Sequence, residues 1–398
     1  MFVELTPGGQ VRVVYAGPIR VVAARLGRSV LLDKKKILAR ARSLEAAGRL
    51  TIRDPAQDAA AQQVFSLAGT TETLFPLGLI GAFDLPMQEF GEELHPFSSA
   101  IREKWPYYTD CKVSAALLRV FQNGHAAVVL TLDFTTSPTA DAAQDVSAIG
   151  QSFAFDGAEN AHLKTGALNA LNKVVPELLQ ALVSGAAPKS KFDGAVRFLS
   201  TFYVMSANWP AVEPHDVHLP SALRPLLQPE ASDRLSNQSN NANEYVAFTS
   251  GFHMYVWNQR VQPDHLQRTI SLVSFLNLMN ILFVQIDDIK NSIVEVLVKR
   301  KTPFLAPTDI DERLEILYSQ IMVSSSSWRR DFSSFRDEIN RRWRLAETKQ
   351  YCFNLIHALE ARSARRRAVF IGALFGVISV AQLISIAEDL VQLLDRAR

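Results

Sequence analysis

The sequence has few cysteines and almost no net charge. It contains two cysteines, Cys111 and Cys352, in 398 residues, which excludes a disulfide scaffold and a four-thiolate zinc site. The 42 Lys and Arg residues nearly balance 40 Asp and Glu, and the formal net charge is +2. The chain is therefore not a polycation that would hold nucleic acid. Hydrophobic residues make up 48% of the chain, which excludes wholesale disorder.

Familiar catalytic and nucleotide-binding motifs are absent as well. No P-loop, G-x-S-x-G, H-E-x-x-H or G-x-G-x-x-G pattern occurs. The densest histidine pair, His215 and His218, lies in a proline-rich stretch that is interpreted as a solvent-facing loop, so no metal site is predicted. Asp133 ends a predicted strand, and no residue is spaced to partner it. No catalytic residue or cofactor is assigned, and a non-enzyme is favoured.

Residues 1–209 alternate between strand-like and helix-like patterns and predict an α+β or α/β domain. Two apolar, β-branched runs flank Asn123-Gly124, which predicts a hairpin at about 114–134 with a type I′ turn. Prolines and an Asn/Ser-rich stretch make 210–243 a predicted linker.

From residue 244 the spacing of apolar residues predicts nearly continuous helix, so 244–367 is interpreted as a helical stalk. The window 270–286 is apolar but holds amide side chains at Asn277, Asn280 and Gln285. It is interpreted as a helix buried along the stalk, and a second membrane span is the alternative.

The last predicted helix runs from 309 almost to the end of the chain. An ordinary amphipathic helix on a single core fits its pattern nearly as well as a coiled coil does. Six apolar residues of this helix recur at steps of three, four or seven: Trp328, Phe332, Phe335, Ile339, Ala346 and Phe353.

Residues 368–387 form the strongest single signal in the sequence. These 20 residues carry no charge, and Gln382 is their only strongly polar side chain. At about 1.5 Å per residue, the segment spans roughly 30 Å, the thickness of a bilayer's hydrocarbon core. It is predicted to be a transmembrane helix followed by a short tail, 388–398, with a buried soluble helix as the alternative.

Basic residues precede this segment, and acidic residues follow it. Lys and Arg accumulate on the cytoplasmic side of a membrane, so the N-terminal domain is expected in the cytosol, with the helix in the cell's inner (cytoplasmic) membrane. The basic stretch 328–367, with a net charge of about +6, is interpreted as positive-inside bias, and an ion-attracting collar is the alternative. The juxtamembrane arginines are Arg362, Arg365, Arg366 and Arg367.

Small and polar residues within the segment predict contacts between helices. Gly372 and Gly376 lie four apart, which lets two helices approach closely in lipid. The amide of Gln382 favours a partner helix or a wet pore over lipid tails. Ser379 and Ser385 are tolerated because their hydroxyls bond to the preceding helical turn. These five residues are the candidates for packing or for lining a pore.

The arginine-rich helix end that runs into VFIGALFGVISV resembles, in its overall arrangement, the CorA-type divalent-cation channels and their divergent relatives. The resemblance implies a cytosolic α/β domain, a long stalk helix and a homo-oligomer, with a pentamer as one stoichiometry. The Gly-Met-Asn pore signature of that family does not occur in the sequence. No second membrane helix is expected, since only about ten residues follow Ala387.

These patterns favour an oligomeric membrane protein. Its cytosolic domain is expected to sense a ligand or protein partner and to act through the stalk on a pore or on a segment that perturbs the lipid bilayer. A membrane-tethered scaffold and a membrane-anchored enzyme with an N-terminal site are the alternatives.

Overall fold

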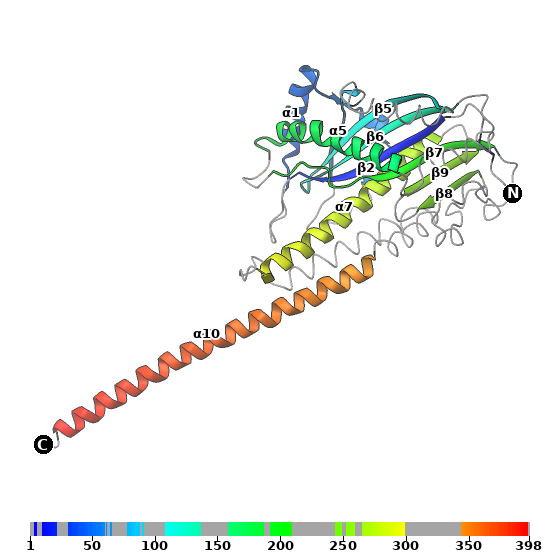
Figure 1. The fold of residues 1–398 in the computed structure, drawn as a ribbon. Coiled ribbons are helices and arrows are strands. Elements are labelled where there is room, and N and C mark those ends of the chain that lie inside the picture. The colour runs from blue at the N-terminus through cyan, green and yellow to red at the C-terminus, as the bar shows by residue number, and fades with distance from the viewer. Residues whose placement is uncertain are drawn as a thin grey trace.

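The protein consists of a mixed α/β sheet unit followed by helices, the last of which projects from the sheet unit (Figure 1). The computed structural model describes residues 4–5, 10–21, 31–59, 61, 64–65, 78–87, 90, 108–136, 158–186, 192–208, 243–248, 252–258, 265–298 and 344–396.

The sheet has nine strands in the described part of the chain. Every pairing is antiparallel except the one between β7 and β9, so the α+β alternative of the predicted fold class describes this unit better. β1 (Glu4–Leu5) pairs with β7 beside the main path. The main path runs in the order β3 (Thr51–Ile52), β4 (Leu79–Asp84), β5 (Tyr108–Phe121), β6 (His125–Thr136), β2 (Gln10–Arg20), β7 (Ser200–Asn208), β9 (Phe252–Asn258) and β8 (Glu244–Phe248).

The β5–β6 hairpin is confirmed, but its predicted turn type is wrong. The loop has three residues, and only Gly124 has a positive φ, of 79°. A type I′ turn requires positive φ at both central residues, whereas a three-residue loop ends on a single left-handed glycine. The Asn123 side chain instead accepts a hydrogen bond of 3.2 Å from the His125 backbone amide.

The prediction of helix from residue 244 onward is wrong for the first part of that range. Residues 244–258 contribute β8 and β9, which extend the sheet beyond β7. Tyr245, Tyr255 and Trp257 are aromatic residues of the kind that strands favour. The sheet unit therefore includes chain that follows the predicted linker.

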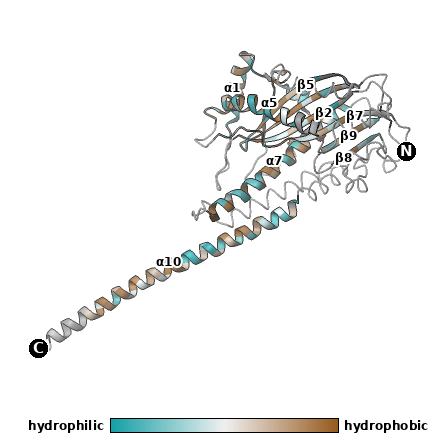
Figure 2. Ribbon diagram, viewed as in Figure 1, coloured by the Kyte–Doolittle hydropathy of each residue, from teal (hydrophilic) through white to brown (hydrophobic). Residues whose placement is uncertain are grey.

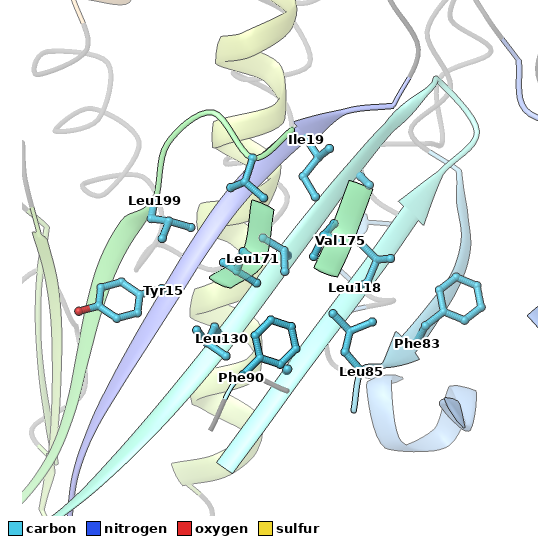
Figure 3. Packing of buried hydrophobic residues seen from close by; sticks show 14 of the residues in the cluster. Tyr15, Ile19, Phe83, Leu85, Phe90, Leu118, Leu130, Leu171, Val175 and Leu199 are labelled. Carbon is cyan, nitrogen blue, oxygen red and sulfur yellow. The ribbon is translucent and has the colours of Figure 1, made fainter. Parts of the chain in front are cut away.

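One face of the sheet is covered by α1 (Lys34–Ala46) and α5 (Ala158–Val183). Leu171 and Val175 of α5 pack against Leu118 and Leu130 of the central strands (Figure 3). This core fixes the register in which the strands pair, because a slip of one residue would turn every apolar side chain to the opposite face of the sheet.

The other face is covered by α7 (His265–Val298), which runs along β2. The central residues of α7 pack mainly against the sheet. The prediction that 270–286 packs along a stalk is therefore wrong. Asn280 has a polar partner there, since its side-chain amide lies 3.2 Å from the Ser200 hydroxyl. An ion pair of 2.6 Å between Arg20 and Asp288 joins the end of β2 to the same helix.

The final helix is α10 (Leu345–Arg396). Arg344 has a φ of 50°, so a single unbroken helix from 309 to the end, as predicted, does not form. The 52 residues of α10 span about 80 Å at the usual rise. Hydrophilic residues occupy its first part and hydrophobic residues the part that projects from the sheet unit (Figure 2).

Candidate functional site

The apolar segment of α10 makes no packing contact that would bury it. Every residue from 364 to 387 is exposed. An apolar surface all around a helix is stable only inside a protein core or in lipid. Eleven large apolar side chains are at least 43% exposed: Val369, Phe370, Ile371, Leu374, Phe375, Val377, Ile378, Val380, Leu383, Ile384 and Ile386.

The helix brings most of the predicted packing residues to one side. At about 100° per residue, Gly372, Gly376, Ser379 and Gln382 fall within roughly a third of the circumference. Ser385 lies outside this arc. Among the described residues, no atom outside the local backbone lies within 4 Å of the Cβ positions that side chains at Gly372 or Gly376 would have. The small-residue surface is therefore open to a partner.

The four arginines that precede the apolar segment do not all lie in the same environment. Arg362 donates from Nη1 to the Leu297 carbonyl at 2.7 Å. Leu297 lies in the last turn of α7, where carbonyls lack partners within the helix. Arg362 therefore binds the end of α7, whereas Arg365, Arg366 and Arg367 are exposed.

The first part of α10 packs against the second half of α7. Ile356 and Leu359 form a small buried cluster with Ile293 of α7. Cys352 is buried nearby, and its burial raises the pKa of its thiol to about 11. The exposed segment is thus a direct continuation of a helix that is anchored on the sheet unit.

A second feature is a cavity of about 540 Å³ between the sheet and the first turns of α7. Arg12 of β2 and Arg119 of β5 line it from the sheet, and Arg53 lines it from the segment after β3. The β5–β6 pairing shifts register between Val113 and Ala115. At this bulge, two successive residues, Ser114 and Ala115, both line the cavity. Bulges often occur next to active sites.

Carboxylates hold two of these arginines in place. Arg119 donates from Nη2 and Nε to Asp58 at 2.6 and 3.1 Å, and both side chains are buried. Arg12 donates from Nε and Nη2 to Asp133 at 2.7 and 3.2 Å. Such bidentate pairs fix the plane of a guanidinium group. Asp133, for which the sequence indicated no partner, is therefore an orienting residue for Arg12.

Arg53 is held more loosely. Its Nη1 lies 3.9 Å from Oδ1 of Asp58, and its Nε lies 3.6 Å from Oδ2 of Asp84. This Nε is buried and makes no hydrogen bond within the described residues. Burial raises the pKa of Asp84, so this carboxylate loses its charge more readily than a solvent-exposed one.

The sequence reasoning missed this cavity. The sequence nevertheless contained a signal for it. Arg119 lies two residues after Leu117 and two residues before Phe121, so all three belong to the same face of a strand. An inward-facing charge on a buried strand requires a partner, which only the fold identifies.

Other predicted features lie outside the described residues. They include the predicted linker 210–243 except its last residue, with His215 and His218, and the stretch 309–343 with most of the coiled-coil-like residues. Within the residues that the structure describes, no group of three His, Cys, Asp or Glu is placed to hold a metal ion.

By length and composition, two helices of the described chain are apolar enough to cross a membrane. In α7, 83% of the apolar window is buried, and in the 346–387 part of α10 none of it is. No family model, curated protein or solved structure matches this chain.

Proposed function

We propose that this protein is an oligomeric membrane protein whose sheet unit senses a ligand and acts through α7 and α10 on membrane-embedded segments at 368–387. The observation that carries the proposal is the uncharged segment of α10, exposed over its whole length. Fully burying each large apolar side chain is worth about 1.5–3 kcal/mol. Lipid provides that burial for a helix with an apolar surface on all sides.

The two ends of α7 support the coupling. Its first turns line the arginine cavity, and its last turn accepts the hydrogen bond from Arg362 of α10. A shift of α7 caused by a bound ligand is therefore transmitted to α10 by direct contact. Since α10 continues without a break into 368–387, the shift reaches the membrane segment through one rigid element.

Assembly into a homo-oligomer follows from the side of the helix that carries Gly372, Gly376 and Gln382. Small residues permit close approach of helices in lipid, and an amide there is stabilised by a partner amide or by water in a pore. A pentamer, which the CorA-like arrangement implies, is the first stoichiometry to test. Arg365, Arg366 and Arg367 orient the sheet unit toward the cytosol.

Ion flux through liposomes that contain the purified full chain tests the pore. We expect flux from the parent protein and a clear reduction with Gln382→Leu. A matched control, Gln350→Leu, changes an exposed amide on the same helix outside the apolar segment and is expected to leave the flux unchanged. A bilayer that stays equally tight with all three proteins contradicts the pore.

Replacing 368–387 by an unrelated apolar helix separates a pore from a simple tether. Loss of flux, together with loss of the oligomer seen by native mass spectrometry in detergent, supports the proposal. A monomer that keeps full function after the replacement supports a tethered scaffold instead.

A further inference from the structure

Within the part of the chain that the structure describes, all the charged side chains that line the cavity are arginines. These are Arg12, Arg53 and Arg119, and none of the described lining residues is Asp or Glu. The partner carboxylates Asp58 and Asp133 orient the guanidinium groups from outside the lining. The surface that a ligand meets is therefore positive, although the wider cluster contains both signs.

These arginines keep hydrogen-bonding capacity after their partners are counted. Arg12 and Arg119 each use Nε and Nη2 on one carboxylate. The Arg119 Nη1 is buried and has no hydrogen-bond partner within the described residues. Among the described residues, the Arg53 side chain makes only longer ion pairs, at 3.6 and 3.9 Å. An unpaired buried donor is unfavourable for the folded protein. A ligand atom that accepts a hydrogen bond from such an arginine donor would remove this cost.

The start of α7 adds to the positive potential. Leu266 and Gln267 lie in its first turn and line the cavity. The unpaired amides of a helix N-terminus carry a partial positive charge that favours anions. The N-terminus of α7 and the arginines therefore both favour an anion in the cavity.

Apolar side chains provide much of the remaining lining. They come from both walls, the sheet and the helix: Val14, Leu117, Val129, Ile270 and Val273. The volume of about 540 Å³ lies within the range of roughly 300–1,000 Å³ for small-molecule sites. A bare inorganic ion would leave this apolar surface uncovered.

We propose that the cavity binds a small amphipathic organic anion, with a phosphate or carboxylate group on the arginines and an apolar body between the sheet and α7. The binding itself stands on the cavity alone. Its role as the signal that moves α7 rests on the proposed function.

Isothermal titration of the detergent-purified full chain tests the inference. The probes are hexyl phosphate, heptanoate, inorganic phosphate and hexanol, and the first two carry the same hexyl chain on different anionic groups. We expect saturable binding of at least one of these two anions. Inorganic phosphate and hexanol should bind roughly tenfold more weakly or worse, because each lacks one half of the recognised structure.

Two variants locate the binding. Arg53→Gln should weaken it by roughly tenfold or more. Arg49→Gln is the matched control, because Arg49 is exposed and pairs with Glu177 away from the cavity. Leu266→Trp adds bulk at a half-exposed lining position and keeps every charge, so it remains informative should Arg53→Gln fail to fold.

The inference is overturned when neither anion binds saturably, or when binding survives both Arg53→Gln and Leu266→Trp. Binding without any effect on liposome flux would remove the proposed coupling and leave the ligand class intact. Flux without binding would remove the ligand class and leave the pore intact. Failure of this inference can therefore be distinguished from failure of the proposed function.

Discussion

The two most apolar helices of this protein, α7 and the 368–387 segment of α10, have similar compositions and opposite surroundings. In α7, Phe275, Leu276 and Leu278 are fully buried against the sheet. In α10, Phe375 and Val377 are more than 60% exposed. A long apolar run therefore identifies a helix that requires a non-aqueous surrounding, while only tertiary contacts reveal whether the protein itself provides it.

The amides of α7 explain part of this difference. Asn280 shares a hydrogen bond with Ser200 of the sheet, which lipid cannot offer. The single amide of 368–387, Gln382, has no comparable neighbour, since the whole segment is exposed. We therefore expect substitutions at matched positions of the two helices to have different consequences.

The largest expected effect comes from the pair Phe275→Ala and Phe375→Ala. Removing the buried ring of Phe275 should lower the free energy of unfolding of the sheet unit by about 3–5 kcal/mol, because the core cannot close the cavity that remains. Phe375→Ala should leave that free energy unchanged. Denaturant unfolding of the detergent-purified full chain, followed by tryptophan fluorescence, measures both, and equal effects would break the comparison.

A second contrast concerns two histidines. His125 is buried in the sheet, with Nδ1 3.3 Å from the Asn123 carbonyl, and its Nε2 has no hydrogen-bond partner among the residues that the structure describes. Burial lowers its pKa to about 4, below the usual histidine value of 6.5. Protonation therefore favours the unfolded chain. The stability contribution is complete above pH 6.5 and is lost as the pH falls toward 4, by about 3 kcal/mol at 1.36 kcal/mol per pKa unit.

Unfolding measured between pH 7 and pH 4 tests this dependence. His125→Gln should remove this part of the slope, because the substituted side chain does not titrate. His357→Gln, at an exposed position of α10, should leave the slope as it is. A parent slope that survives in His125→Gln would contradict the assignment.

A smaller effect is expected where the two helices meet. Arg362→Ala removes the hydrogen bond to the Leu297 carbonyl and should destabilise the end of α7 by about 1–2 kcal/mol, since the guanidinium is only partly buried. Hydrogen exchange of amides in the last turns of α7 should then accelerate by roughly tenfold. Arg365→Ala, at an exposed position, provides the control. Identical exchange in both variants would remove Arg362 as the link.

Local sequence signals were sufficient for several elements. Asn123-Gly124 between β-branched runs predicted the β5–β6 hairpin, although the turn is longer than expected. The apolar helix at 368–387 follows from composition alone, whereas its exposure does not. Strands β8 and β9 were missed because each is short and apolar, and short apolar runs do not distinguish helix from strand.

The arginine cavity required the fold itself. Arg12 and Asp133 are 121 positions apart in the sequence and become neighbours through the register of β2 and β6. Asp58 reaches Arg119 from a short 3-10 helix, η1 (Pro55–Asp58), which follows β3 in the chain. Neither pairing has a fixed spacing that a motif could capture.

Extraction of membranes with alkaline carbonate tests the central claim most directly, that 368–387 resides in lipid. The full-length chain should remain with the membrane pellet. A variant with Leu374→Lys and Ile378→Lys should move to the supernatant, because each lysine near the bilayer centre costs about 2.5–3.5 kcal/mol. Full-length protein that leaves the membrane and stays a single soluble species would contradict the account.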